Sequence, residues 1–121
     1  MSDSIRALQK EIIDFRDERD WKQFHNPEDL AISISLEAAE LLEVFQWSAQ
    51  DVEVPEKRDK VKEELADVIN YAFLLADCMD FDVDEIVREK IARNREKYPT
   101  ELAYGNSAKY TELKEAGRQE K

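Results

Sequence analysis

The sequence predicts an all-α protein, and three observations support this prediction. The 121 residues include only 2 glycines and 3 prolines, so positions that end regular structure are few and the elements should be long. Charged residues make up 39% of the chain, a proportion that suits long solvated helices. Apolar residues recur at helical spacing, whereas no alternating pattern of useful length indicates a strand. We therefore predict an antiparallel four-helix bundle.

Four segments carry the helical pattern. They span about residues 3–20, 27–47, 55–79 and 84–98. Asn26 can cap the second helix, with Pro27 at its first position, and Pro55 suits the start of the third. Asp82 or Asp84 can cap the fourth helix, and Pro99 ends it.

The domain prediction follows from these boundaries. Residues 1–99 form one helical domain, and residues 100–121 form a polar tail that we expect to be mobile, with partner docking as the alternative.

The charge of the chain excludes several classes of partner. The formal net charge is −11, from 18 basic and 29 acidic residues. Such a surface repels nucleic acid and anionic membranes, although a phosphate compound could bind through metal ions. Cys78 is the single cysteine, so no internal disulfide can form. Because the sequence has no apolar run like that of a signal peptide or membrane span, we expect a cytoplasmic protein.

Four acidic residues depart from the surface positions typical of acids. Glu37 falls in the middle of the apolar stripe of the second helix, and Glu40 lies on its margin. On the third helix Glu64 and Asp67 lie on the flank of the stripe. Both pairs have i, i+3 spacing, so each presents two carboxylates on one helix face. Clustered carboxylates repel one another and lose solvation when buried, so protons, basic side chains or metal ions must neutralise them.

The ligand chemistry favours a hard divalent cation. Carboxylate oxygens suit magnesium, manganese or calcium. A di-iron site would need a histidine in each pair, but His25 is the single histidine and lies between helices. Zinc lacks its usual histidine and cysteine ligands. An ion-pair network with Arg58, Lys60 or Lys62 remains the alternative to a metal.

Further residues could contact a nucleotide. The aromatic and histidine residues nearest the acids are Trp21, Phe24, His25, Trp47 and Tyr71. They could stack on a base, or they could close the ends of a bundle core. On the fourth helix Asn94 lies inside the apolar stripe and Lys90 at its edge, where each could meet a ligand or a neighbouring helix.

Several of these motifs occur together in one known family. The chain resembles the MazG-like, all-α nucleoside triphosphate pyrophosphohydrolases, and is most similar to the branch that includes the dCTP pyrophosphatases. The resemblance covers about Ile5 to Pro99. The matching motifs are residues 15–27, 37–47, 63–71 and 90–99.

The resemblance implies a function. It implies magnesium-dependent hydrolysis of dCTP or a related nucleoside triphosphate to the monophosphate and pyrophosphate. The implied role is the control of nucleotide pools, and the implied assembly is a homodimer or homotetramer. Manganese is a possible substitute. The implied metal-binding and catalytic residues are Glu37, Glu40, Glu64 and Asp67. The implied substrate contacts are Trp21, His25, Trp47 and Tyr71 at the base and sugar, and Lys90 and Asn94 at the phosphates or the sugar end. The alternative is a non-catalytic acidic helical module that binds divalent cations or a partner protein.

Overall fold

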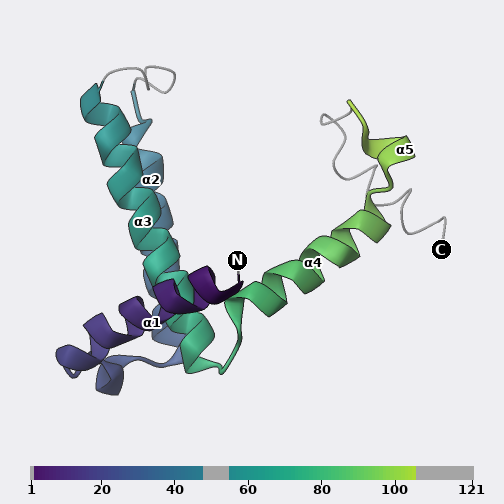
Figure 1. Cartoon of the computed structure of the whole chain (residues 1–121). Coiled ribbons are helices and arrows are strands. Elements are labelled where there is room, and N and C mark those ends of the chain that lie inside the picture. The colour runs from purple at the N-terminus through teal and green to yellow at the C-terminus, as the bar shows by residue number, and fades with distance from the viewer. Residues whose placement is uncertain (1, 48–54, 106–121) are drawn as a thin grey trace. The chain divides into compact units, whose positions relative to one another are not determined.

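The computed structural model describes residues 2–47 and 55–105, and its regular elements in these ranges are all helical (Figure 1). They are α1 (Ser2–Glu18), the short 3-10 helix η1 (Trp21–Phe24), α2 (Pro27–Val44), α3 (Pro55–Cys78), α4 (Val83–Lys97) and α5 (Thr100–Ala103). The prediction of an all-α protein is confirmed. None of the described helices combines the length and apolar character needed to cross a lipid bilayer.

The local signals in the sequence explain where the main helices begin. The Asn26 side chain accepts a hydrogen bond from the Asp29 backbone N–H at 2.8 Å, and Pro27 occupies the first turn of α2. Pro55 likewise begins α3. Two short elements were not predicted: η1 occupies the segment interpreted as a break, and α5 lies in the segment interpreted as a tail. The predicted loop at residues 48–54 and the rest of the tail, residues 106–121, lie outside the described residues.

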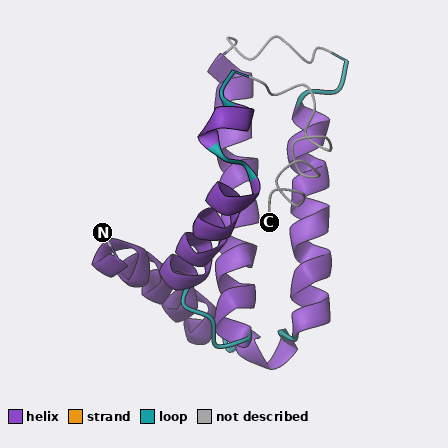
Figure 2. Ribbon diagram, turned by 90° about the vertical axis from the view of Figure 1, so that its right-hand side faces the viewer, coloured by secondary structure: helices purple, strands orange, loops and turns teal. Residues whose placement is uncertain are grey.

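The chain forms two compact units, residues 1–83 and residues 84–121. In the first unit α2 and α3 lie side by side and antiparallel, and α1 crosses the end of α3 (Figures 1 and 2). The second unit contains α5 and all of α4 beyond its first residue. Antiparallel packing is therefore seen for α2 and α3, whereas the arrangement of four helices as a bundle stays a prediction, as do the predicted domain boundaries.

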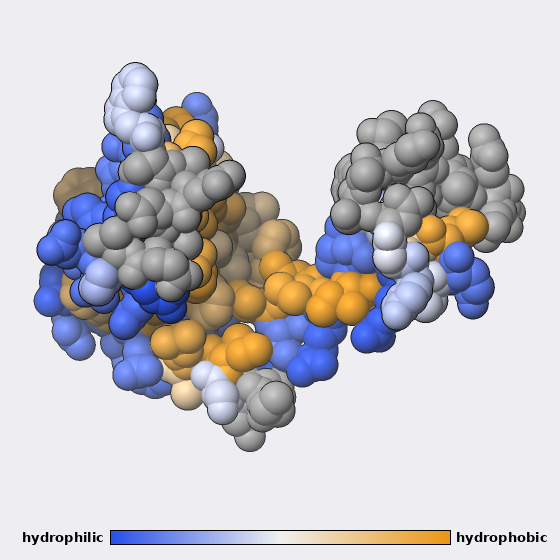
Figure 3. All heavy atoms as spheres, turned by 90° about the horizontal axis from the view of Figure 1, so that it is seen from above, coloured by the Kyte–Doolittle hydropathy of each residue, from blue (hydrophilic) through white to orange (hydrophobic). Residues whose placement is uncertain are grey.

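The described part of the chain has a small interior. Its buried apolar residues are Leu30, Leu74 and Ala76. Many larger apolar side chains reach the surface, as the orange areas in Figure 3 show.

One buried ion pair ties α1 to α3. The Arg16 side chain is only 3% exposed, and its Nη1 donates to Asp77 Oδ2 on α3 at 2.8 Å. Its Nε also donates to Asp17 Oδ1 at 2.9 Å. Because Arg16 is removed from water, its charge depends on these two carboxylates, and the position of α1 depends on the contact with Asp77.

We expect Asp77→Asn to destabilise the protein by about 1–3 kcal/mol, because it removes the charge that Arg16 pairs with across the helices. The matched control is Asp14→Asn, which removes the partner of the exposed Lys10 within α1 and should change stability little. Urea denaturation at one fixed protein concentration measures both. Equal loss of stability in the two variants would contradict this role of Arg16.

Candidate metal and nucleotide site

Three carboxylates meet where α2 and α3 pack together. Glu37 and Glu40 lie one turn apart on α2, and Glu64 lies on α3. One carboxylate oxygen from each lies within 4.8 Å of the corresponding oxygens of the other two. The i, i+3 spacing on α2 and the antiparallel packing of α3 produce this arrangement. We call these three residues the carboxylate triplet.

The pKa values of two carboxyls in the triplet are raised, because the carboxyls repel one another and are partly removed from water. The neighbouring Glu37 carboxyl, close enough to share a proton, raises the pKa of Glu40. Partial burial, and then the Glu40 carboxyl, raise the pKa of Glu64. Glu37 Oε2 and Glu64 Oε2 are both buried, and neither has a hydrogen-bond partner among the described residues. Since ionised carboxylates only accept hydrogen bonds, the triplet needs a proton or a cation, and its all-oxygen ligand set fits magnesium or manganese.

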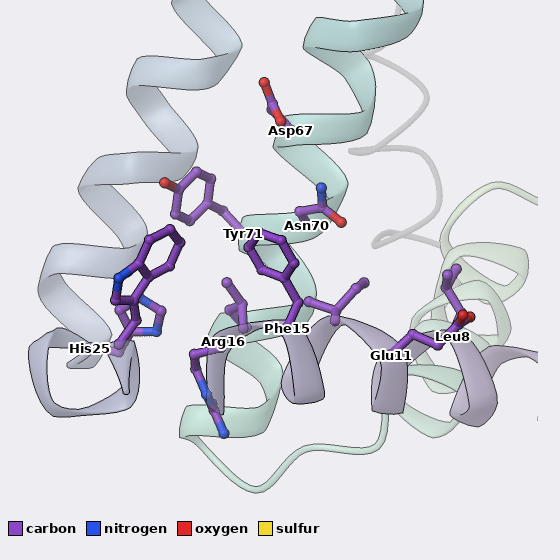
Figure 4. Close-up of a pocket in the computed structure, with 11 residues that line it drawn as sticks. Leu8, Glu11, Phe15, Arg16, His25, Asp67, Asn70 and Tyr71 are labelled. Atoms are coloured by element: carbon purple, nitrogen blue, oxygen red, sulfur yellow. The ribbon is translucent and has the colours of Figure 1, made fainter. Parts of the chain in front are cut away.

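Asp67, the fourth predicted ligand, lies just beyond the triplet. It is three residues after Glu64 on α3, and its charge contributes to the raised pKa of Glu64 after burial and Glu40. Its side chain lines a neighbouring cavity instead of completing the triplet (Figure 4). A role for Asp67 as a metal ligand stays a prediction.

A cavity of about 510 Å³ lies between α1, η1 and α3. This volume is within the range that small-molecule sites occupy. The predicted residues Trp21, His25 and Tyr71 line it together with Asp67 (Figure 4). The cavity therefore shares Asp67 with the surroundings of the triplet, and a ligand in it would lie beside the carboxylates.

Aromatic side chains form one wall of the cavity. Asp20 adopts a left-handed conformation (φ 55°) after the end of α1, and the next residue, Trp21, lies against Phe15. The two rings pack edge to face with their centroids 5.8 Å apart. The guanidinium of Arg19 lies 3.7 Å from the centre of the Phe15 ring and donates a hydrogen bond to the Phe15 carbonyl at 2.9 Å. These contacts hold the wall in place from its outer side.

His25 contributes a neutral polar group to the cavity. Burial, and then the positive charge of Arg16, lower the pKa of His25, so the imidazole is neutral at pH 7. Its Nδ1 is buried and has no hydrogen-bond partner among the described residues.

The other predicted residues lie elsewhere in the structure. Trp47 follows α2 and is 94% exposed, outside the cavity, and Phe24 is also exposed. Lys90 and Asn94 lie one turn apart on α4, in the second unit, where Lys90 is exposed and Asn94 half-buried. Their contact with substrate stays a prediction.

The structure adds lining residues that sequence reasoning did not assign to the site. They are Leu8, Glu11, Ile12, Phe15, Arg16, Asn70 and Leu74. Leu8, Ile12 and Phe15 recur at helical spacing on α1, and this apolar stripe lines the cavity rather than a closed core. The sequence did carry a signal for Asn70, because it follows Asp67 by three residues and so lies one helical turn away.

Proteins of known sequence and structure resemble most of this chain. The chain is 39% identical over 117 residues to dCTP pyrophosphatase 1 of Mus musculus and 40% identical over 116 residues to dCTP pyrophosphatase 1 of Homo sapiens. These matches cover 92% of this chain but 66% of each relative, so the chain spans slightly less than two thirds of their length. The crystal structure of a pyrophosphatase from Archaeoglobus fulgidus matches with a TM-score of 0.70 and 40% sequence identity, covering 79% of this chain and 93% of that chain.

The family assignment agrees with the motifs found in the sequence. Residues 32–113 match the sequence model of the MazG-like family. This range is more than half of the chain, and it contains the carboxylate triplet and Asp67. The chain belongs to the MazG-like family.

Proposed function

We propose that the protein hydrolyses a deoxynucleoside triphosphate, dCTP or a related one, to the monophosphate and pyrophosphate, and so controls nucleotide pools. The observation that carries this proposal is the carboxylate triplet, with two buried oxygens that lack partners, beside a cavity walled by aromatic rings. The names of the similar proteins support it, since those from mouse and human are dCTP pyrophosphatases. They also favour an enzyme over a non-catalytic helical module.

The triplet is the proposed magnesium site. Glu37, Glu40 and Glu64 would hold the cation, with manganese as a substitute, and the resemblance adds Asp67 to this set. When bound, the cation would neutralise charge on the triphosphate oxygens and lower the pKa of a bound water. We assign the acceptance of the water's proton to Glu40 or Glu37, because both carboxylates lie in the triplet where the cation would hold that water.

The cavity is the proposed nucleoside site. Trp21, Tyr71 and neutral His25 offer stacking surfaces and hydrogen-bonding atoms to the base and sugar. The triphosphate would then extend past Asp67 toward the triplet, because Asp67 borders both. The resemblance also places Trp47 at the base, a position that this structure leaves exposed.

We infer that the active protein is a homodimer or homotetramer. On α2 the exposed Ile32 and Leu36 are four residues apart, so they form one apolar strip along the helix. Leu65 and Ile69 form a second such strip on α3. Strips on the two helices that carry the triplet suit packing against a second copy of the chain, which would complete the helical bundle.

We expect Glu40→Ala and Asp67→Ala each to reduce magnesium-dependent pyrophosphate release on the order of 100-fold or more, the scale on which an enzyme slows when one electrostatic stabiliser is lost. Chromatography of the products from dCTP and the other three deoxynucleoside triphosphates measures this and ranks the substrates. Circular dichroism should show that helical content is kept.

The matched control for these variants is Glu63→Ala. Glu63 is next to Glu64 in sequence, but it is exposed and lies outside the carboxylate triplet. This variant should keep the activity of the unchanged protein. Release of orthophosphate with a diphosphate product, or activity that survives both Glu40→Ala and Asp67→Ala, would overturn the proposed function.

We expect the protein to have the mass of two or four chains of 14.2 kDa in size-exclusion chromatography with light scattering. The double variant Leu36→Glu/Ile69→Glu should form smaller assemblies, because it places charges in both apolar strips. Leu102→Glu on α5 is the control for adding a charge outside α2 and α3. A monomeric mass for the unchanged protein at micromolar concentration would refute the inferred assembly.

A further inference from the structure

Asn70 offers the cavity a polar group that no other contact uses. It lies on α3 between Asp67 and Tyr71 and lines the cavity (Figure 4). Its side chain is exposed, so a bound molecule can reach it. Among the described residues the Asn70 amide has no hydrogen-bond partner. The amide is therefore free to turn about its terminal bond.

The charged groups of the cavity are less suited to reading a base. Arg16 is occupied by its ion pairs with Asp17 and Asp77. The carboxylates of Asp67 and Glu11 only accept hydrogen bonds when ionised. The Asn70 amide, by contrast, holds a donor and an acceptor side by side in one plane, which is the arrangement that pairs with the edge of a base.

The aromatic wall and Asn70 supply complementary parts of base recognition. Stacking on Trp21 and Phe15 tolerates every base, because each base has a π-face. Discrimination between an amino and a keto group must then come from hydrogen bonds at the base edge. Asn70 is the cavity residue whose unpaired amide can make two such bonds together.

Resting on the proposed function, we propose that Asn70 contacts the hydrogen-bonding edge of the base and accepts both amino and keto pyrimidines. Cytosine presents the N4 amino donor beside the N3 acceptor, whereas uracil presents the O4 acceptor beside the N3 donor. Rotating the Asn70 amide by half a turn exchanges the positions of its donor and its acceptor, so the amide can pair with either base edge. Because no described residue fixes the amide, the cavity takes deoxynucleoside triphosphates of both kinds.

The test compares kcat/KM for dCTP and dUTP, which differ only at this edge, in the unchanged protein and two variants. The unchanged protein should use both within about tenfold of each other. Asn70→Asp is nearly the same size but only accepts hydrogen bonds. At the 4-position it can accept from the amino group of cytosine but is repelled by the keto oxygen of uracil, so it should shift the ratio toward dCTP by at least about tenfold. Asn70→Leu removes both bonds, so it should lower kcat/KM for both nucleotides and leave the ratio near that of the unchanged protein.

The ratio separates base reading from other effects of the variants. A change in metal binding caused by the new carboxylate acts on both nucleotides equally and cancels. Gln9→Glu adds the same charge on α1 outside the cavity, and it should change neither rate nor ratio.

Hydrolysis of both nucleotides with unchanged ratios and rates in both Asn70 variants would overturn this inference and leave the proposed function standing. A preference of the unchanged protein for one of dCTP and dUTP above about 100-fold would also overturn this inference, because the order of donor and acceptor in the site would then be fixed. Failure to hydrolyse any deoxynucleoside triphosphate would overturn the proposed function and this inference together.

Discussion

Repulsion between the carboxylates of the triplet opposes the packing of α2 against α3. The pKa of Glu40 is raised by Glu37, and that of Glu64 by burial and by Glu40, so bringing the helices together places negative charges where water is partly excluded. Two of the carboxylate oxygens are buried without any partner among the described residues. The fold thus brings together charges whose repulsion a divalent cation would remove, and this constraint links the stability of the helix pair to its function.

The cavity between α1, η1 and α3 depends on a different contact. It is bounded by α1 and η1 as well as α3, and α1 is held to α3 through the buried Arg16 and its partner Asp77. The same guanidinium, after burial, lowers the pKa of His25. Arg16 therefore positions one wall of the cavity and helps to keep the imidazole in that wall neutral, although Arg16 itself is occupied by its ion pairs.

Much of the fold and part of the site could be predicted from the sequence, for physical reasons. Capping by Asn26 and the proline positions are local effects, so the helix starts were predictable. Glu37 departed from the surface pattern of an acidic helix, which revealed the triplet. Arg16 was missed because its role depends on α1 crossing α3, and helical periodicity does not encode how distant helices pack. Asn70 was missed although it lies one helical turn from Asp67. The high exposure of Trp47 could not be predicted either, because the sequence does not show whether an apolar helix face packs within the chain or stays exposed.

The most direct test of the carboxylate constraint is the urea midpoint of unfolding at fixed protein concentration, with and without magnesium, between about pH 5 and about pH 8. Raised pKa values mean that the folded chain binds more protons than the unfolded one, so in metal-free protein these groups cost more stability as pH rises through those values. Magnesium replaces the protons, so the stabilisation it gives should grow with pH, vanish in Glu40→Gln and persist in Glu63→Gln. A magnesium effect that is absent at every pH, or equal in these two variants, would contradict the account.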